Sequence, residues 1–487
     1  MSTNTQPVSP GANPHVIIVG AGIGGLTLAL LLERAGVSYV VLEKTSSIKP
    51  LGSALAVSGH LTYLFRQLGI FDEFHDKSLV YEEARGHDGN CNPTSNVDLR
   101  PSVPMTGSNW YIVARPVLYN LIYDKIPKDK IHLNKRVTTI HNGDTSARVD
   151  CKDGSTFEGD LIVGADGAYS PVRQGLFKWL KENNKLPSSD DLPMPYNCVC
   201  LVGQTGELDP KEYPDIGKDL CTFDSMTSTT TPYTWAIFTT KQRTICWMAI
   251  EHLNKSSSKE HEHESSRNSD WGPEAAEAMA QAVRDLPILN AGKTGTSLGD
   301  LIDKTDKNLI SKVVLEEKVY KTWYGGRTVL LGDACHKLNP SAGAGAMSAI
   351  HDAICLANWL NVLPSLAVND LEATFKKYRS ERYPHVKVAY RASAALAKGL
   401  EKNTAGAIVR FLNAHMPKWL WVRYLKSAVK YRPQASFLDA VEDTGTVRPR
   451  GQTSLVKTRI LFEALLKKQQ EASLSLKPTM TAGPVAV

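Results

Sequence analysis

The fold of this chain is decided by residues 15–43, HVIIVGAGIGGLTLALLLERAGVSYVVLE. A strand of buried character (15–19) runs into a G-x-G-x-x-G turn, and an apolar helical pattern follows from Leu26 to Arg34. A second strand, 39–42, ends in Glu43. The order strand, glycine turn, helix, strand and acid predicts a βαβ unit that binds a dinucleotide.

Each part of this motif has a mechanical reason. Gly20 permits the tight turn, Gly22 lets the backbone approach a pyrophosphate, and Gly25 lets the helix lie close to the strand. The phosphates then meet the unpaired N–H groups at the helix N-terminus. Glu43 is placed to bind a ribose 2′-hydroxyl and would repel a 2′-phosphate, which favours FAD or NAD over NADP. The motif alone does not distinguish the flavin from the nicotinamide cofactor.

Composition excludes several other classes of protein. The chain has 487 residues, of which 42% are hydrophobic and 22% charged, as expected for a globular protein of two or three lobes. A net charge of +6 without a Lys/Arg-rich run argues against nucleic-acid binding. The eight cysteines form no C-x-x-C pair and no ligand spacing, so we expect no metal and a reducing, cytoplasmic setting. No signal peptide or transmembrane helix is predicted.

Changes of pattern divide the chain. A polar, disordered N-terminus is expected over 1–14, and the nucleotide-binding domain over 15–190 and 310–370. Residues 191–309 are rich in short Thr, Val, Tyr and Trp runs and predict an inserted substrate domain built on a mixed or antiparallel sheet, with a polar loop at 254–272. A helical region is expected over 371–469, followed by a disordered tail over 470–487.

Two further segments carry acids at the ends of predicted strands. The strand 160–163 leads into Gly164-Ala-Asp166-Gly167, and the strand 328–331 leads into Gly332-Asp333. After Asp333, a loop with Pro340, Gly343 and Gly345 opens a long helix over 344–362, whose first N–H groups suit an electron-rich ring edge.

With these segments in this order and spacing, the chain resembles the class A FAD-dependent monooxygenases. It is most similar to the fungal enzymes of secondary metabolism, such as the indole-diterpene epoxidases, and GRTVLLGDACHKLNP (326–340) carries the closest match. The resemblance covers roughly residues 15–390. It implies an α/β architecture, in which a Rossmann-type FAD-binding fold holds the inserted sheet domain and a helical C-terminal region follows.

The resemblance also implies which residues hold tightly bound FAD. Gly20, Gly22, Gly25 and Glu43 would bind the ADP half, and Gly52 in the loop after the second strand would approach the cofactor. Further contacts are implied for Arg115, for Asp166 by the pyrophosphate, for Asp333 by the ribityl or pyrophosphate region, and for the backbone of Gly345 and Ala346 near the isoalloxazine ring.

The implied reaction uses NAD(P)H and O2 to hydroxylate or epoxidise a small molecule. No second G-x-G-x-x-G unit is present, so we expect NAD(P)H to bind transiently at the flavin. An apolar, aromatic-bearing sheet suits a hydrophobic substrate. His60 and Tyr196 are the candidate catalytic residues, because they lie where the family's substrate cavity is found. The departures from the family's pattern, Gly59-His60 and Ala344 to Met347, fall mainly on this substrate side.

Alternatives stay open at this level. The same scaffold serves flavin-dependent reductases and halogenases, and a flavin-binding redox protein without turnover is a third possibility. Residues 407–429 mix Trp, Phe and Leu with Arg and Lys, which is typical of a helix packed on the protein body, with peripheral membrane contact as the alternative. The sequence is consistent with a monomer or a homodimer.

Overall fold

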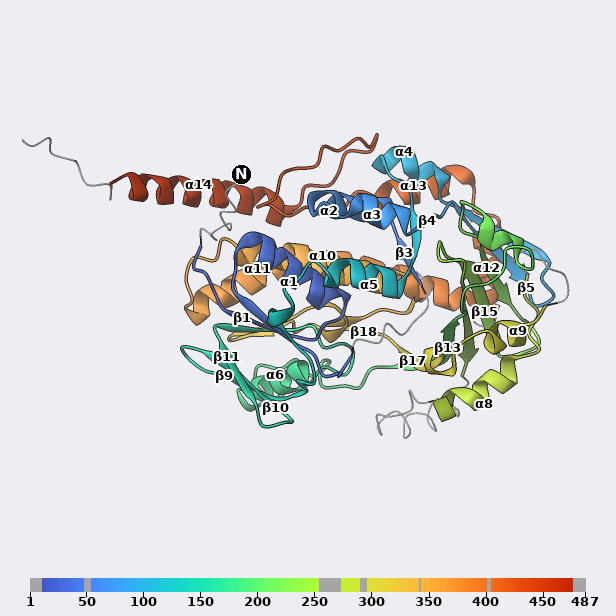
Figure 1. Cartoon of the computed structure of the whole chain (residues 1–487), viewed down its shortest axis with the longest axis horizontal. Coiled ribbons are helices and arrows are strands. Elements are labelled where there is room, and N and C mark those ends of the chain that lie inside the picture. The colour runs from blue at the N-terminus through green and yellow to red at the C-terminus, as the bar shows by residue number, and fades with distance from the viewer. Residues whose placement is uncertain are drawn as a thin grey trace, which may run out of the picture.

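A computed structural model describes residues 11–47, 54–253, 273–289, 296–340, 343–400 and 404–475. Gly52, the polar loop 254–272 and most of the two expected disordered termini lie outside these ranges. One end of the molecule holds the βαβ unit and the other a separate large sheet, with α10 and α11 running between them (Figure 1). The predicted α/β class, with an FAD-binding fold and an added sheet domain, is confirmed.

The first sheet is built around the βαβ unit. Its six strands follow the order β19-β20-β12-β1-β2-β8 and are parallel except for β19. The bounds are β1 Val16–Val19, β2 Tyr39–Leu42, β8 Ile131–His132, β12 Leu161–Gly164, β19 Tyr324–Gly325 and β20 Thr328–Leu330. The four central strands are buried along their whole length. Continuous burial is what a parallel sheet covered on both faces requires.

Helices cover this sheet. α1 (Ile23–Ala35) packs along α10 (Ala344–Leu360), and both are almost wholly buried. Smaller elements complete the lobe: α2 Thr62–Gln67, α3 Phe71–Asp76, α4 Val103–Thr106, α5 Arg115–Tyr123 and α6 Pro171–Glu182, with a sheet of β3 Ala54–Val57, β7 Tyr111–Ala114 and β4 Leu79–Val80, and another of β11 Thr156–Gly159, β10 Ala147–Cys151 and β9 Val137–Asn142.

The second large sheet has seven strands in the order β17-β13-β16-β15-β14-β5-β6. Their bounds are β5 Glu83–Asp88, β6 Pro93–Asp98, β13 Tyr196–Gln204, β14 Phe223–Thr227, β15 Tyr233–Thr239, β16 Ile245–His252 and β17 Ser311–Glu316. All neighbours are antiparallel except β14 and β5, so the sheet is mixed. One face is covered by α8 (Pro273–Val283) and α9 (Leu298–Asp303).

The sheet recruits strands from beyond 191–309. β5 and β6 come from the N-terminal half, and β17 lies just past residue 309. The cause is long-range pairing: Arg85 on β5 makes two hydrogen bonds of 2.8 Å to the buried Asp224 on β14. Such a pair cannot be read from local periodicity.

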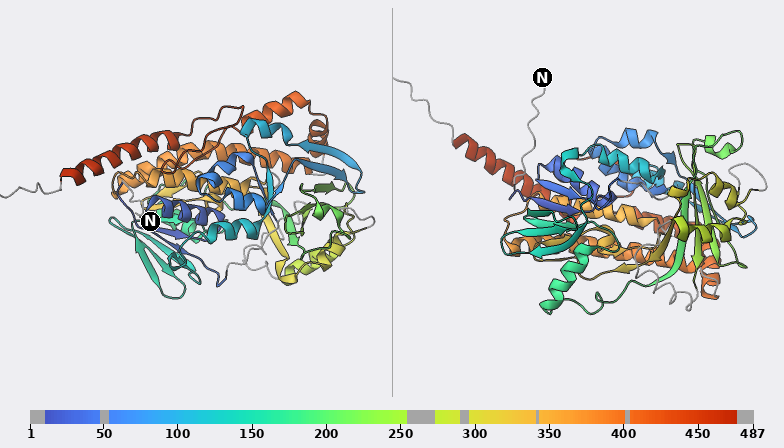
Figure 2. Two further views of the ribbon diagram at one scale, coloured as in Figure 1. Left: turned by 45° about the horizontal axis from the view of Figure 1, so that its top comes forward. Right: turned by 60° about the horizontal axis from the view of Figure 1, so that its bottom comes forward.

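Four helices form most of the C-terminal region: α11 Val368–Leu400, α12 Thr404–Ala414, α13 Lys418–Ala428 and α14 Thr453–Ser475. The region thus begins slightly before residue 371, and residues 429–452 form neither helix nor strand. Residues 470–475, expected in a disordered tail, continue α14, which extends away from the body (Figure 2). Good helix formers such as Glu471 and Leu474 explain this extension. Within the described ranges, no helix is long and apolar enough to cross a membrane.

Candidate active site

The glycine turn after β1 shows which glycines the protein itself requires. Gly20 has a φ of +105°, and a Cβ there would lie 2.4 Å from the carbonyl oxygen of Ala165. A Cβ on Gly25 would lie 2.1 Å from the carbonyl oxygen of Gly20. A Cβ on Gly22, in contrast, would meet no protein atom within 4 Å. Packing therefore accounts for Gly20 and Gly25 but not for Gly22, whose predicted role is the close approach of a ligand.

Glu43 lies beside this turn at the end of β2. One carboxylate oxygen accepts a hydrogen bond of 2.9 Å from the N–H of Ala21, and the other accepts bonds of 3.0 Å from the N–H and the hydroxyl of Thr45. The half-buried carboxylate therefore holds the glycine turn in place and puts negative charge where an adenosine ribose would lie.

The sheet brings the acids of the other two segments to the same edge. Because β20, β12 and β1 are parallel neighbours, the residues that follow them, Asp333, Asp166 and Gly20, all lie at the carboxyl ends of the strands. Ligands of open α/β sheets bind at this edge. The order of strands therefore unites three motifs that together span more than 300 residues of the sequence.

Asp166 has one oxygen to offer a ligand. Its Oδ2 accepts a hydrogen bond of 3.1 Å from the N–H of Val172, whereas the buried Oδ1 has no hydrogen-bond partner in the described part of the chain. Burial raises the pKa of this carboxyl, and hydrogen bonds from Ser170 and Val172 act in the opposite direction. A buried acceptor without a partner is costly, and a hydroxyl donor of a bound ligand would satisfy it.

Arg115 lies close enough to Asp333 for their charges to interact. Arg115 is accessible to solvent, yet protein surrounds it closely enough that desolvation lowers its pKa, while the charge of Asp333 acts to raise it. The Asp333 carboxylate accepts a hydrogen bond of 2.7 Å from Lys337, so an acid and two bases lie close to one another.

The start of α10 completes the candidate cofactor site. We call Gly20, Asp166, Asp333 and the first turn of α10 the cradle. Gly343 caps the helix with a φ of +60°, and a Cβ on Gly345 would meet no protein atom within 4 Å. The first N–H groups of the helix, including those of Gly345 and Ala346, have no acceptor within the helix and attract negative charge.

A buried ionic network fixes this helix to the Asp333 loop. Asp352 on α10 accepts hydrogen bonds from the N–H of Gly332 at 3.1 Å, from His336 at 2.5 Å and from Arg382 at 2.8 Å. Burial acts to raise the pKa of Asp352, but His336 and Arg382 outweigh it and hold the pKa below its usual value. Cys335, His336 and Asp352 each have an atom that could bind a metal ion, and these atoms lie within 4.8 Å of one another. The positively charged guanidinium of Arg382 already pairs with the Asp352 carboxylate, which opposes the binding of a cation there.

His60 lies near the start of α10, beside the cradle. Its Nε2 is 3.0 Å from the Ser58 hydroxyl, which donates to the sulfur of Met347 at 3.1 Å. The His351 ring is 5.3 Å away, and the buried His60 Nδ1 and His351 Nε2 have no hydrogen-bond partner among the described residues. Burial lowers the pKa of His60 to about 4 and that of His351 well below its usual value. Both imidazoles are therefore neutral near pH 7.

Tyr196 has different surroundings. It pairs with Glu316 across β13 and β17. Glu316 accepts a hydrogen bond of 2.7 Å from the hydroxyl of Tyr169, which follows the Asp166 turn. Burial raises the pKa of Tyr169, and Glu316 and the nearby Tyr196 raise it further. Tyr196 thus lies near the Asp166 segment, whereas His60 lies near α10.

Sequence reasoning missed His351, Asp352 and Arg382. The available signal was weak: His351 and Asp352 are adjacent polar residues in a helix that is otherwise largely apolar. Their partners, His60 and Arg382, come from distant segments.

The second face of the seven-stranded sheet is apolar and looks toward the cradle. Alternation along the strands puts Val202, Met248, Phe238 and Phe223 on this face, where the rings of Phe223 and Phe238 stack at 5.3 Å. The same apolar cluster includes Ala54 and Ala56 of β3, and a Cβ on Gly343 would lie 3.7 Å from Ala56. The start of α10 and the apolar sheet face therefore border the same region.

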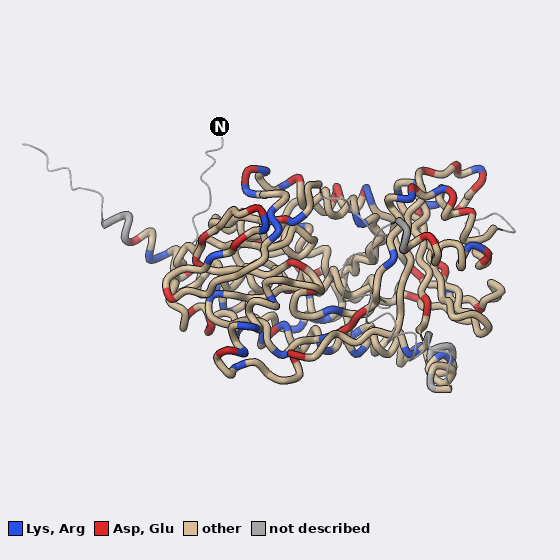
Figure 3. The backbone as a smooth tube through the Cα atoms, turned by 90° about the horizontal axis from the view of Figure 1, so that it is seen from below, with Lys and Arg blue, Asp and Glu red and all other residues tan. Residues whose placement is uncertain are grey.

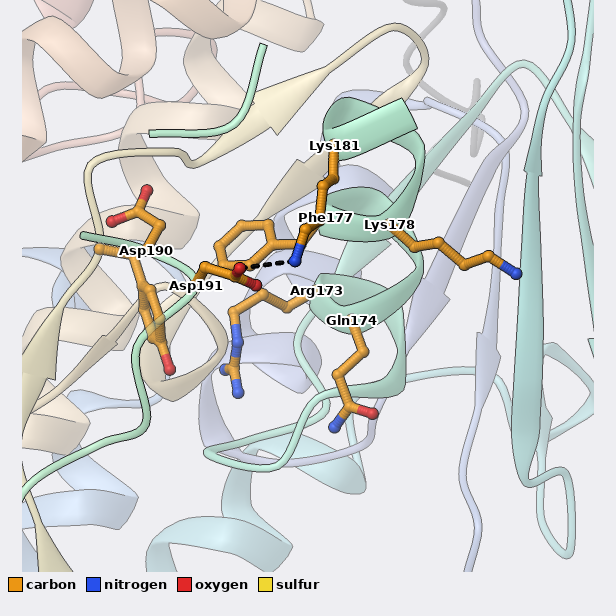
Figure 4. A pocket seen from close by; sticks show the side chains of 8 residues that line it. Arg173, Gln174, Phe177, Lys178, Lys181, Asp190 and Asp191 are labelled. Atoms are coloured by element: carbon orange, nitrogen blue, oxygen red, sulfur yellow. Dashed lines mark hydrogen bonds and ion pairs between the residues drawn. The ribbon is translucent and has the colours of Figure 1, made fainter. Parts of the chain in front are cut away.

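A separate open pocket of about 360 Å³ is lined by residues of α6 and of the segments around Asp190 and Tyr320 (Figure 4). Arg173 extends into it and donates hydrogen bonds to the carbonyl oxygens of Ala168 at 2.6 Å and Ala334 at 3.0 Å, which joins the Asp166 and Asp333 segments. None of the expected cofactor residues lines it. The lining residues are Arg173, Gln174, Phe177, Lys178, Lys181, Asp190, Asp191 and Tyr320.

Comparison with known proteins gives the family of the chain. A family described as "FAD binding domain" matches residues 13–188 and 294–393. The FAD-dependent monooxygenase ptmM of Penicillium ochrochloron is 31% identical, covering 79% of this chain and 88% of the relative. The FAD-dependent monooxygenase paxM of Penicillium paxilli is 30% identical, covering 79% and 78% respectively.

Solved structures show the same fold. Klebsiella pneumoniae HpxO, complexed with FAD and uric acid, superposes with a TM-score of 0.66 at 18% identity, covering 85% of this chain and 96% of HpxO. FqzB superposes with a TM-score of 0.65 at 18% identity and covers 96% of both chains.

Proposed function

Since the chain belongs to the FAD binding domain family and is an FAD-dependent monooxygenase, we propose that it uses NAD(P)H and O2 to oxygenate a hydrophobic small molecule. The observation that carries the proposal is the position of the apolar sheet face next to the first turn of α10. In balanced form, substrate, O2, NAD(P)H and a proton give the oxygenated substrate, NAD(P)+ and water. Hydroxylation and epoxidation both satisfy this balance.

The residues described above fit FAD. Gly20, Gly22 and Gly25 would hold the pyrophosphate at the N-terminus of α1, with Glu43 at the adenosine ribose. Asp166 Oδ1 would accept a hydrogen bond from the cofactor, and Asp333 and Arg115 would contact its phosphate and ribityl region. The N–H groups of Gly345 and Ala346 would face the electron-rich edge of the isoalloxazine ring. FAD, when bound and reduced, supplies the electrons that activate O2.

The chain's own residues then control orientation and water. The side chains of Val202, Met248 and Phe223 offer no hydrogen bonds, so they favour an apolar substrate and keep water from the reacting centre. His60 is neutral, and its Nε2 donates to the Ser58 hydroxyl, so its Nδ1 can accept one hydrogen bond from a substrate hydroxyl. We propose His60, with His351 beside it, as the polar contact of this cavity. Tyr196 remains a second candidate on the Asp166 side.

Oxygen incorporation tests the proposal directly. Purified protein should show flavin absorbance and oxidise NAD(P)H faster when an accepted apolar substrate is added. With isotopically labelled O2, the product should carry one labelled oxygen atom. An unlabelled product, or NAD(P)H oxidation that no apolar compound from a fungal extract accelerates, would contradict the proposal. Asp333→Ala, in which flavin content should fall, is the control for cofactor dependence.

A further inference from the structure

Large apolar side chains are exposed around the turn between α12 and α13. Ile408, Phe411 and Leu412 occupy one stripe of α12 at the spacing of a single helix face, and 61% of the Phe411 side chain is exposed. Trp419, exposed to 68%, and Leu420 open α13 after a turn of three residues, 415–417. We call residues 408–424 the α12–α13 corner. It lies at the end of the molecule that holds the seven-stranded sheet (Figure 1).

These exposed residues are not the packing face of the helices. α13 packs through Trp421, Val422 and Leu425, and the Trp421 indole N–H donates a hydrogen bond of 2.7 Å to the carbonyl oxygen of Asp98. Trp419 and Tyr424 lie outside these packed clusters and are solvent-exposed. Core packing therefore does not account for them.

The corner itself carries only basic charges, and the acid nearest to it in the fold, Asp98, is paired with Arg100 at 2.8 Å. No Asp or Glu occurs from Thr404 to Leu438. Lys418, Arg423 and Lys426 are all exposed on α13. Elsewhere along the chain, acidic and basic residues are intermixed (Figure 3). Exposed aromatic and aliphatic side chains beside exposed cations are typical of helices that lie in a membrane interface.

We propose that the α12–α13 corner docks the enzyme on an anionic lipid surface. Phe411, Leu412 and Trp419 enter the boundary between headgroups and acyl chains, while Lys418 and Arg423 contact lipid phosphates. Docking is peripheral, since no described helix can span the bilayer. A protein partner is less well matched, because protein interfaces are depleted of lysine, whereas Lys418 in the corner and Lys426 on the next turn of α13 are both exposed.

Docking there has a consequence for the active site. Trp421, on the packed face of α13, belongs to the same apolar cluster as Phe238 and Met248 of the sheet face. A lipid surface at the corner therefore lies one helix away from the apolar wall of the cavity. This position suits a substrate that dissolves in membranes, although docking itself does not depend on the substrate.

Vesicle sedimentation tests the proposal with the full-length, FAD-loaded protein. Vesicles of phosphatidylcholine with phosphatidylserine should sediment the wild type at low salt. Phe411→Ser combined with Trp419→Ser should lower the partition coefficient about tenfold for each side chain. Lys418→Gln combined with Arg423→Gln should lower it about fivefold for each charge, and only on vesicles that contain phosphatidylserine. Salt should weaken binding in the same way.

Val456→Ser combined with Ile460→Ser is the matched control, because Ile460 on α14 is exposed to 62%. This variant should sediment with vesicles like the wild type. Flavin content and NAD(P)H oxidation in detergent-free buffer should be unchanged in every variant, which separates docking from catalysis. The proposal is overturned if the wild type does not sediment with vesicles, or if the corner variant binds as the wild type does. It is also overturned if the corner variant only converts a dimer to a monomer.

Discussion

Gly22 and Gly25 lie three residues apart and should respond to alanine in opposite ways. At Gly25 the added methyl would lie 2.1 Å from a backbone carbonyl oxygen, which cannot move without separating α1 from β1. Overpacking of this kind costs about 1–3 kcal/mol or more. At Gly22 the methyl meets nothing in the protein, and the φ of −72° suits alanine. Gly22→Ala should leave the apoprotein unchanged or stabilise it by about 0.4–1 kcal/mol.

Gly22→Ala, which should not destabilise the apoprotein, should nevertheless weaken FAD binding. The methyl would occupy the space through which the pyrophosphate approaches the N–H groups of α1, so FAD affinity should fall about 10–100-fold. Urea unfolding of apoprotein gives the stability, and quenching of flavin fluorescence on titration gives the dissociation constant. Gly451→Ala is the matched control, because its methyl also meets no protein atom: its stability should respond as that of Gly22→Ala does, and its FAD affinity should stay unchanged.

The reasoning is refuted if Gly22→Ala binds FAD as tightly as the wild type, since the turn would then not hold the phosphates. It is equally refuted if the Gly22→Ala apoprotein is destabilised as much as Gly25→Ala. A loss of FAD affinity in Gly25→Ala carries no weight, because a displaced helix would cause it at any site on the turn.

Three further outcomes are expected. Asp352→Asn should cost about 3–5 kcal/mol of stability by leaving the buried Arg382 without its charge partner, and adding Arg382→Met should recover most of that loss in thermal unfolding. Burial lowers the pKa of both His60 and His385 to about 4. The free energy of unfolding should therefore fall by about 1–3 kcal/mol for each imidazole as the pH is lowered from about 6.5 toward 4. His60→Gln should flatten the curve of unfolding free energy against pH, and a curve parallel to that of the wild type would contradict this. Met248→Gln should raise the KM for an apolar substrate about tenfold with unchanged flavin content, and an unchanged KM would place the substrate elsewhere.

Much of the cofactor site could be predicted because its signals are local. Residues 15–43 contain strand, turn, helix and acid in one contiguous unit, so β1, α1 and β2 follow from hydrophobic periodicity and glycine spacing. Asp166 and Asp333 each follow a short apolar strand, which identifies them as acids at strand ends. The start of α10 at Ala344 was likewise visible from the glycines before a helical pattern. The residues that contact FAD remain predictions.

Other features depend on pairs of residues that periodicity does not connect. The sequence does not indicate that Arg85 would meet Asp224, and so it did not place β5 and β6 in the large sheet. His351 faces His60 across 5.3 Å only because α10 packs against the segment after β3. The sequence also left open whether the stripe around Phe411 is buried or exposed. The same apolar helical pattern occurs in helices packed on a core and in helices on a membrane surface.

The sequence by itself therefore determined the dinucleotide turn, the class of fold and the three acids that follow strands. Each of these depends on backbone conformation within a few residues, where glycine, strand and helix preferences act directly. Only the tertiary structure decided that Gly20, Asp166 and Asp333 share one edge, because that follows from the strand order β20-β12-β1. It also decided which apolar surface faces the cradle and which faces solvent, because burial is set by contacts between distant segments.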